Sequence, residues 1–301
     1  MHASEPAPPA PAQAAASLLL LRDGETGLEV FHVRRAATMA FSAHATAFPG
    51  GRVDPADDAA LAPAVTGAPG AADLGAWARR LGLEEHPVET QAEDEPAVVA
   101  ARLLAAVVRE TFEETGVLLA RTAEGVPADA ETAAALAPRR EAVERHEQDF
   151  VALLAEHGLT PDASGLRAWQ RWITPVSVPR RYDTAFFLVA VPEGQEPDRL
   201  TTEATEHGWA APAALIEAFR AGEVNLMTPT WAQLRALRDV GSVAEALAVG
   251  SAPEPIPVVQ LVPDRSPEER RDEFAHADEY LADQRSFRTC ARVAETPDNI
   301  L

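Results

Sequence analysis

The sequence contains no lysine: all 26 of its Lys+Arg residues are arginine. A chain without lysine has no amine side chain for covalent catalysis through a Schiff base. It has one cysteine, Cys290, so neither an intramolecular disulfide nor a zinc cluster built from cysteines can form. These absences suit a reducing compartment and give no indication of redox chemistry.

Long hydrophobic runs are also absent. The N-terminus is rich in proline and lacks the basic region and long apolar stretch of a signal peptide. The leucines at 18–21 are too few to cross a bilayer. We therefore expect residues 1–15 to form a flexible leader, no association with membranes, and a cytoplasmic location.

Acidic residues are in large excess over basic ones. The chain has 47 Asp+Glu against 26 Lys+Arg, which gives a formal net charge of −21. This charge repels nucleic acid over most of the surface and argues against a nucleic-acid-binding protein. A small polyanionic substrate would need a local cationic site. With 47% apolar side chains over 301 residues, the chain can still bury a sizeable core.

Apolar periodicity and turn residues indicate alternating strands and helices. Paired glycines at Gly50 and Gly51 predict a tight turn. Expected strands cover 17–21, 28–33, 172–176 and 184–191, and expected helices cover 97–119, 130–157, 212–220 and 229–238.

Composition divides the chain into one domain with additions. We expect the domain at 16–249, with an insertion at about 55–96 that carries one short helix and an extra helical segment at about 130–170. Prolines and charged residues predict an extended C-terminal arm at 250–301, with at most a short helix around 267–282.

Three glutamates carry the clearest chemical signal. Glu110, Glu113 and Glu114 stand at i, i+3 and i+4 of the helix expected at 97–119, so their carboxylates share one face. Such a cluster repels itself unless a cation neutralises it. Magnesium binds a few carboxylates together with water and substrate phosphate, so the spacing indicates a metal-assisted phosphoryl or pyrophosphoryl site. The alternative is a solvated acidic helix face.

The context of these acids favours the metal site. Arg109 precedes them, Gly116 and Val117 follow them, and the turn at Gly51 comes earlier in the chain. This ordered set resembles the Nudix box, whose pattern is G-x5-E-x7-R-E-U-x-E-E-x-G-U, with U an apolar residue.

The match departs from the pattern in three places. Thr111 occupies a position that is usually apolar. The box is split, because Gly51 to Val117 spans 67 residues against 23 in the pattern. The early glutamate has no clean counterpart, although Asp57 lies six residues after Gly51.

A split box resembles one branch of the family, the peroxisomal coenzyme A and acyl-CoA diphosphatases and their bacterial relatives. Residues 28–51, which end in F-P-G-G, look like a segment of that branch. So do W-I-T-P at 172–175 and R-R-Y-D-T-A-F-F at 180–187.

The resemblance implies a Nudix-type α/β/α sandwich with a mixed β-sheet and helical insertions. It implies Mg²⁺ (or Mn²⁺) held by Glu110, Glu113 and Glu114, and hydrolysis of the diphosphate in a nucleoside diphosphate-X compound, with coenzyme A or acyl-CoA as the best candidate. We interpret Glu110, Glu114 and Arg109 as catalytic. Arg109 would orient the glutamates through ion pairs. The general base is open between Glu110 and Glu203.

The resemblance also implies further ligands. Glu203 is preferred to Glu206 as an additional metal ligand, with a solvated loop carboxylate as the alternative.

The predicted substrate-binding residues share a position in or beside the resembling segments and are Arg35, Gly50, Gly51, Arg180 and Arg181. Guanidinium groups bind phosphate with two hydrogen bonds, which suits a polyanion on an acidic protein. Paired surface arginines at the start of a strand are nevertheless common.

Two other functions remain open at this stage. The first is Nudix hydrolysis of nucleotide sugars or dinucleotides, and the second is a non-catalytic Nudix domain that senses a nucleotide derivative. Intact glutamates argue against the sensor. The expected partner is a small-molecule diphosphate, without nucleic acid or membrane, and a homodimer is allowed.

Overall fold

The computed structural model describes residues 9–35, 45–57, 73–198, 204–262 and 274–290. Its largest feature is a mixed sheet in the order β10-β3-β2-β1-β8-β7-β11, with β4 also paired to β1 and β9 to β2. The strands of this sheet are β1 (Gln13–Gly24), β2 (Gly27–Arg35), β3 (Ala45–Ala47), β4 (Gly50–Arg52), β7 (Arg167–Ile173), β8 (Tyr182–Ala190), β9 (Ala204–Ala210), β10 (Asn225–Leu226) and β11 (Val258–Gln260). The central pair β1 and β8 is parallel, whereas β1 and β2 form an antiparallel hairpin.

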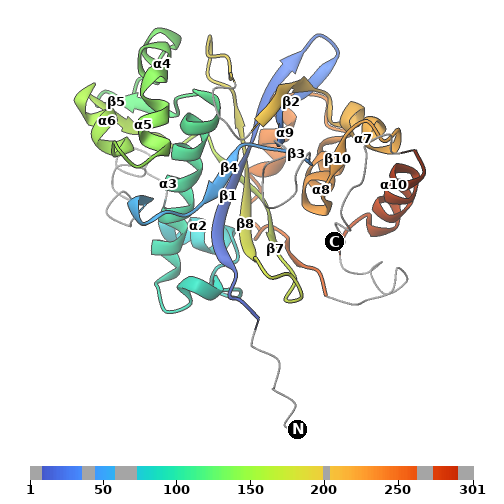
Figure 1. Ribbon diagram of the computed structural model, residues 1–301. Coiled ribbons are helices and arrows are strands. Elements are labelled where there is room, and N and C mark those ends of the chain that lie inside the picture. The colour runs from blue at the N-terminus through green and yellow to red at the C-terminus, as the bar shows by residue number, and fades with distance from the viewer. Residues whose placement is uncertain (1–8, 36–44, 58–72, 199–203, 263–273, 291–301) are drawn as a thin grey trace.

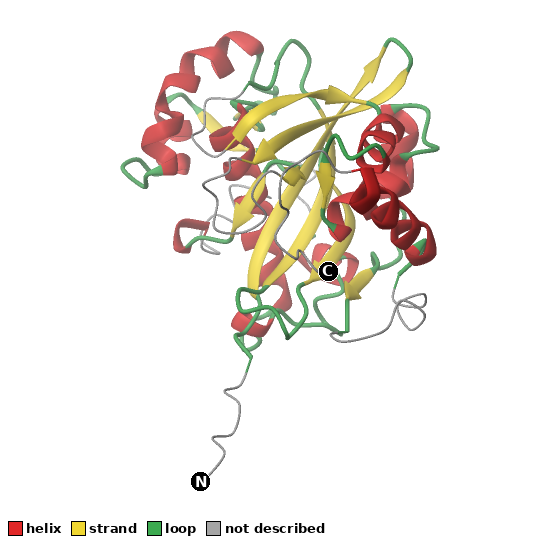
Figure 2. Ribbon diagram, turned by 45° about the vertical axis from the view of Figure 1, so that its right-hand side comes forward, coloured by secondary structure: helices red, strands yellow, loops and turns green. Residues whose placement is uncertain are grey.

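Helices cover both faces of this sheet (Figures 1 and 2). Side chains alternate along a strand, so one strand can serve two cores. In β1, Leu18 and Leu20 belong to the core beneath α3 (Pro96–Thr115). Leu19 and Leu21 belong to the core beneath α7 (Pro212–Arg220) and α8 (Thr228–Leu237). The predicted α/β/α sandwich is confirmed.

The layer on the α3 side begins with the segment after β4. Its elements are η1 (Pro55–Asp57), α2 (Leu74–Arg80), η3 (Glu89–Gln91), α3 (Pro96–Thr115), α4 (Ala130–Leu136), η4 (Ala137–Arg139), α5 (Arg140–Glu144) and α6 (Phe150–Glu156), with a two-stranded sheet of β5 (Ala120–Thr122) and β6 (Leu159–Pro161). Helix α3 starts with a proline in its first turn, which needs no amide donor there. It ends at Gly116, whose φ of 75° is left-handed and favours glycine.

The opposite layer contains α7 (Pro212–Arg220), α8 (Thr228–Leu237), α9 (Val243–Gly250) and α10 (Ala277–Cys290). No helix in the described ranges is both long and apolar enough to cross a membrane.

The hairpin, the strand at 184–191, and the helices at 97–119, 212–220 and 229–238 are confirmed, with shifted ends. The strand expected at 172–176 is placed too late, because β7 covers Arg167–Ile173 and shares only two residues with it. The single helix expected at 130–157 is wrong, because α4, η4, α5 and α6 replace it. Pro138 lies in the 3-10 turn that ends the first piece, and His146 has a left-handed φ of 56°. Asp149 then caps a new helix through the amide of Ala152.

The description of 250–301 as an extended arm also needs correction. Strand β11 pairs with β7, and α10 is a 14-residue helix. Tyr280 and Phe287 are buried, and Phe287 stacks on Phe219 of α7 at 4.9 Å between ring centroids. Spacing of this kind along one helix face indicates packing rather than extension.

The expected leader of 1–15 is too long at its C-terminal end. Strand β1 already starts at Gln13, and Ala12 and Ala14 are buried. Ala12 is held further by its amide, which donates to Glu89 Oε2 at 2.8 Å.

Candidate active site

The two halves of the split motif meet beside β1. Strand β4 pairs with β1, so Gly51 lies opposite Ala16 and next to helix α3. The Gly50 amide donates to Glu114 Oε2 at 2.9 Å, although the two residues are 64 positions apart. This contact shows that the glycine pair at the start of β4 and the acidic helix lie side by side despite the insertion between them.

Gly51 is required by the position of Glu110. A Cβ on Gly51 would lie 2.3 Å from Glu110 Oε1, which is closer than any real contact. At Gly50, a Cβ would lie 2.3 Å from the Ala16 carbonyl oxygen, and its φ is 149°. Gly50 therefore lets β4 approach β1, and Gly51 lets Glu110 approach the backbone of β4.

Arg109 is the centre of an ion-pair network. Its Nε and Nη2 each donate to the Asp57 carboxylate at 2.8 Å, and its Nη1 donates to Glu110 at 3.0 Å and to Glu113 at 3.0 Å. Its side chain is 7% exposed. With its fork fully used by protein acceptors, Arg109 is a positioning residue that fixes two of the glutamates, as the sequence suggested.

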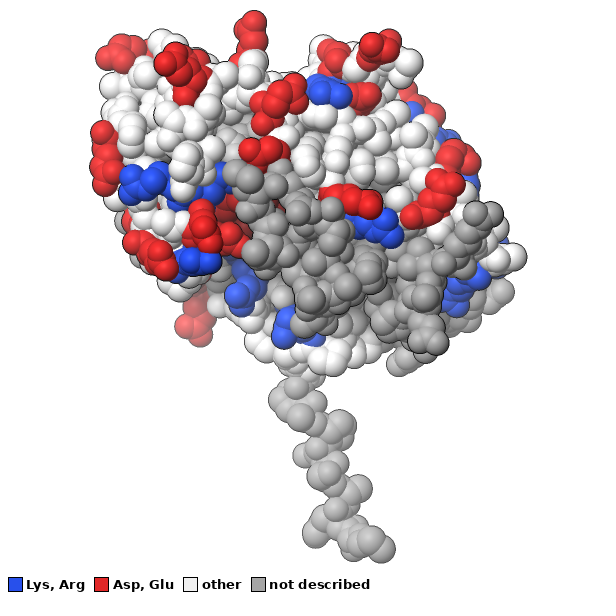
Figure 3. Space-filling view, turned by 45° about the horizontal axis from the view of Figure 1, so that its top comes forward, with Lys and Arg blue, Asp and Glu red and all other residues white. Residues whose placement is uncertain are grey.

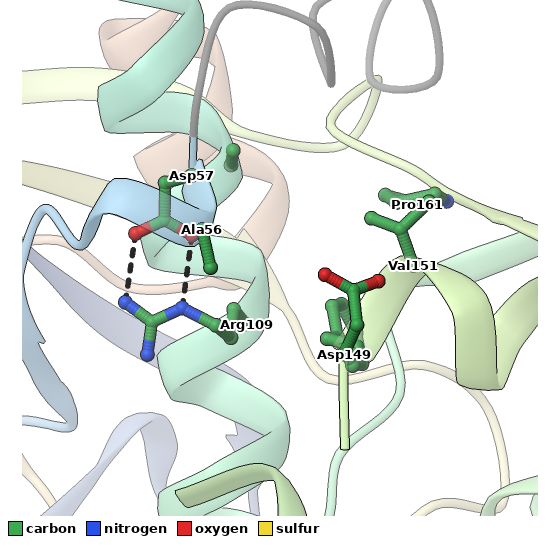
Figure 4. Close-up of a pocket in the computed structure, with 8 residues that line it drawn as sticks. Ala56, Asp57, Arg109, Asp149, Val151 and Pro161 are labelled. Atoms are coloured by element: carbon green, nitrogen blue, oxygen red, sulfur yellow. Dashed lines mark hydrogen bonds and ion pairs between the residues drawn. The ribbon is translucent and has the colours of Figure 1, made fainter. Parts of the chain in front are cut away.

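Asp57 is the site residue that the sequence reading missed. It is 1% exposed and binds Arg109 with both carboxylate oxygens (Figure 4). It lies six residues after Gly51, which is the spacing of the early glutamate in the Nudix pattern. The signal was therefore present, and aspartate takes the place of glutamate at the start of the insertion.

A pocket lies beside this ion pair, between η1, α3 and α6. Figure 4 shows Asp149 and Val151 across it from Asp57 and Arg109. The other residues that line it are Ala56, Ala105, Phe150 and Pro161. Asp57 and Arg109 thus line this pocket, whereas Glu110, Glu113 and Glu114 are not among its lining residues.

Burial makes the acidic cluster electrostatically unfavourable. It raises the pKa of the Glu110 carboxyl to about 7, with Arg109 opposing the rise and Glu113 adding to it. It raises the pKa of Glu113 in the same way. Burial would lower the pKa of Arg109, but hydrogen bonding and charge from Asp57 and the glutamates raise it. Negative charge is thus in excess here.

The donor chemistry fits a divalent cation. Arg109 supplies one positive charge against the carboxylates of Asp57, Glu110, Glu113 and Glu114. In the described part of the chain, no three such groups already converge as a cation site. Both carboxylate oxygens of Glu113 instead accept from Arg109. Excess oxygen donors, here two buried and two half-buried carboxylates, are nevertheless what magnesium or manganese binds.

Thr111 is accommodated at its usually apolar position. The residue is buried, and its hydroxyl donates to the Val107 carbonyl of the same helix at 2.6 Å. The departure from the motif therefore leaves no unsatisfied hydroxyl in the core.

The structure does not support Arg181 as a substrate-binding residue. Arg181 is 2% exposed and binds Glu89 through two hydrogen bonds of 2.6 and 2.8 Å. It also donates to the carbonyls of Thr174 and Ala10. Its donors are used within the protein, so it ties β8 to the insertion instead of binding phosphate.

The remaining predicted residues have different positions. Arg180 is exposed at the turn before β8. Arg35 ends β2 and pairs with Ala204 of β9, and its side chain lies outside the described part. Glu203 also lies outside the described residues, and Glu206 is exposed and pairs with Arg34 at 3.2 Å.

We expect Gly51→Ala to reduce metal-dependent hydrolysis about 100-fold, because the added methyl group displaces the Glu110 carboxylate, and a misplacement of about 1 Å can have that effect. The φ of Gly51 is outside the left-handed region, so the backbone tolerates alanine. Gly241→Ala is the matched control, since its Cβ would meet its nearest neighbour at 3.5 Å. Initial rates and melting curves of both variants test this expectation. If Gly51→Ala hydrolyses substrate as fast as Gly241→Ala, the close approach of Gly51 and Glu110 is not needed for activity.

Comparison with known proteins identifies the family. The model of the NUDT19 Nudix domain matches residues 7–237. The human acyl-coenzyme A diphosphatase NUDT19 is 34% identical over 159 residues, which are 50% of this chain and 42% of that protein. The chicken protein of the same name is 33% identical over 250 residues, covering 73% of this chain and 64% of its own. The chain thus spans about half to two thirds of these relatives.

A solved structure agrees with the sequence matches. The crystal structure of a NUDIX hydrolase from Alicyclobacillus acidocaldarius is 30% identical, covers 79% of this chain and 96% of its own, and superposes with a TM-score of 0.56. Together with the family model over residues 7–237, this shows that the chain belongs to the Nudix hydrolase family, in the group of the NUDT19 Nudix domain.

Proposed function

We propose that this protein hydrolyses the diphosphate linkage of coenzyme A or a short acyl-CoA in the presence of Mg²⁺ or Mn²⁺. The observation that carries the proposal is the assembled site, in which Gly50 and Gly51 bring Glu114 and Glu110 against β4. The relatives named acyl-coenzyme A diphosphatase support the substrate class.

The residues that would hold the metal are Glu110, Glu113 and Glu114. When bound, the cation neutralises the diphosphate and lowers the pKa of a bound water. Arg109 holds Glu110 and Glu113 in place, and Asp57 holds Arg109. The Gly50 amide donates to Glu114 Oε2 and so fixes this carboxylate against β4.

The reaction adds water across one P–O–P linkage. One P–O bond forms to the water oxygen, one P–O bond to the bridging oxygen breaks, and coenzyme A yields 3′,5′-adenosine bisphosphate and 4′-phosphopantetheine. Glu110 is the proposed proton acceptor, because its carboxylate belongs to the cluster that would hold the cation and its bound water. Glu203 is the alternative base.

Analysis of products by mass spectrometry tests the substrate. The protein is incubated with magnesium and, in parallel, with coenzyme A, an acyl-CoA, a nucleotide sugar and a dinucleotide. Phosphopantetheine from coenzyme A supports the proposal. Efficient turnover of the nucleotide sugar with no phosphopantetheine would retain the Nudix chemistry and reject the coenzyme A assignment.

The two adjacent arginines should respond differently to mutation. Figure 3 shows arginines dispersed among acidic side chains on one face of the molecule. The loss of a single arginine should therefore weaken the binding of a polyanionic substrate. We expect Arg180→Ala to raise KM about tenfold, the value of one charge-assisted hydrogen bond, with little change in kcat.

We expect Arg181→Ala to lower the unfolding free energy by about 2 kcal/mol, because the Thr174 carbonyl loses its buried donor.

Kinetics and chemical denaturation of both variants check this expectation. Arg79→Ala is the control, since Arg79 is an exposed arginine of α2 that pairs with exposed Asp73 at 3.7 Å. If Arg180→Ala leaves KM at the control value, Arg180 does not bind substrate.

A further inference from the structure

The C-terminal turn of α3 carries Glu113 and Glu114 and is held from outside the helix. The last carbonyl groups of a helix have no partner within it. Here Arg140 Nε donates to the Glu113 carbonyl at 3.1 Å, and the Asp198 amide donates to the Thr115 carbonyl at 2.9 Å. Two separate segments therefore satisfy the end of the acidic helix.

These two segments are joined to each other. Arg140 Nη1 forms an ion pair with the Asp198 carboxylate. Hydrogen bonds and this ion pair thus form a closed ring of contacts from Glu113 through Arg140 and Asp198 to Thr115. A positive charge at a helix C-terminus is also favourable, because the exposed carbonyls carry partial negative charge.

The site of Arg140 is built for a guanidinium. Arg140 is 3% exposed, and a Cβ on Gly116 would lie 3.1 Å from Arg140 Nη1. Gly116 therefore gives the helix its left-handed end and also leaves room for this side chain. Among the described residues, Arg140 Nη2 is buried without a hydrogen-bond partner. An apolar residue would avoid that cost, so packing alone does not explain an arginine here.

We propose that Arg140 is a positioning residue for the metal site, which it serves by fixing the turn of α3 that bears Glu113 and Glu114. This inference rests on the proposed function. Arg109 and Gly51 fix Glu110 one turn earlier, whereas the Glu113 backbone depends on Arg140. Without Arg140 the last turn of the backbone loosens. Arg109 still holds the Glu113 carboxylate and the Gly50 amide still holds that of Glu114, so the separation of these carboxylates becomes less well fixed but is not lost.

The test measures Mn²⁺ binding to the full chain by electron paramagnetic resonance, alongside hydrolysis and melting temperature. Arg140→Met keeps most of the side-chain volume and should weaken Mn²⁺ binding about tenfold, as residues that support metal ligands do. Asp198→Asn keeps the backbone contact to Thr115 and should weaken binding less. The Asp198 side chain is about half exposed, so Asp198→Asn should fold normally. This variant therefore tests the role of the ion pair even if Arg140→Met folds poorly.

Arg121→Met is the matched control. Arg121 is a buried arginine of the same layer and pairs with Asp162 at 3.1 Å. It should lose stability without a change in Mn²⁺ binding. The proposal is overturned if Arg140→Met binds Mn²⁺ as the wild type does, or if Arg121→Met weakens binding equally. A wild type that binds Mn²⁺ but cleaves no diphosphate would reject the proposed function instead.

Discussion

Glu114→Gln is expected to lower metal-dependent hydrolysis by about 10²–10³-fold while the fold is retained. The Gly50 amide lies 2.9 Å from Glu114 Oε2, and an amide oxygen can still accept this hydrogen bond. What the substitution removes is a negative charge that balances the cation. Loss of one preorganised electrostatic contact to a transition state has an effect of this size.

Rates at subsaturating magnesium and melting temperatures without metal measure the two effects separately. The melting temperature should not fall, since the substitution removes charge from a cluster with excess negative charge. Glu141→Gln is the control, because Glu141 is an exposed acid of α5 paired with Arg145. A wild-type rate for Glu114→Gln, equal to that of Glu141→Gln, would show that the metal assignment is wrong.

The parts of the site that follow from local spacing could be predicted. Glu110, Glu113 and Glu114 share a helix face by periodicity alone, and Gly116 ends that helix by its backbone freedom. The tight turn predicted at Gly50 and Gly51 is wrong, because these residues begin strand β4 and the bend precedes them at Pro49. The family pattern predicted that the glycine pair meets the helix, which the contact from Gly50 to Glu114 confirms.

The parts that depend on distant partners could not be predicted. Arg181 looked available for phosphate because its partner, Glu89, is 92 positions away in the insertion. A charged motif does not reveal whether its charges face substrate or each other.

The insertion shows the same limit. The composition of residues 55–96 indicated an insertion with one short helix, yet Leu81, Leu83 and Val88 are buried in the core beneath α3. These buried side chains and the ion pair from Glu89 to Arg181 make the described part of the insertion a packed part of the domain.

Asp183, the acidic residue of the R-R-Y-D-T segment, is also structural. Asp183 accepts hydrogen bonds from Arg171 Nε at 2.6 Å and Nη2 at 2.5 Å, and both side chains are essentially fully buried. Arg171 Nη1 also donates to the Leu81 carbonyl at 3.2 Å. This pair joins β7 and β8 to the loop after α2, so it links the central sheet to the insertion.

Asp183→Ala should therefore lower the unfolding free energy by about 3–5 kcal/mol, because it leaves the Arg171 guanidinium buried without its counter-ion. The melting temperature should fall by roughly 10 °C for a chain of this size. The double substitution Arg171→Met with Asp183→Leu replaces both charges by apolar groups and should recover most of the loss. Denaturant unfolding of the wild type, the single variant and the double variant measures this.

The same variants separate structure from catalysis. The double variant should keep a kcat and KM near those of the wild type at temperatures where it is folded, since neither residue touches the glutamates of α3 through any described hydrogen bond. A folded double variant with a raised KM for coenzyme A would instead place Asp183 in substrate binding. A double variant as unstable as Asp183→Ala would show that the ion pair itself supplies stability that apolar packing does not replace.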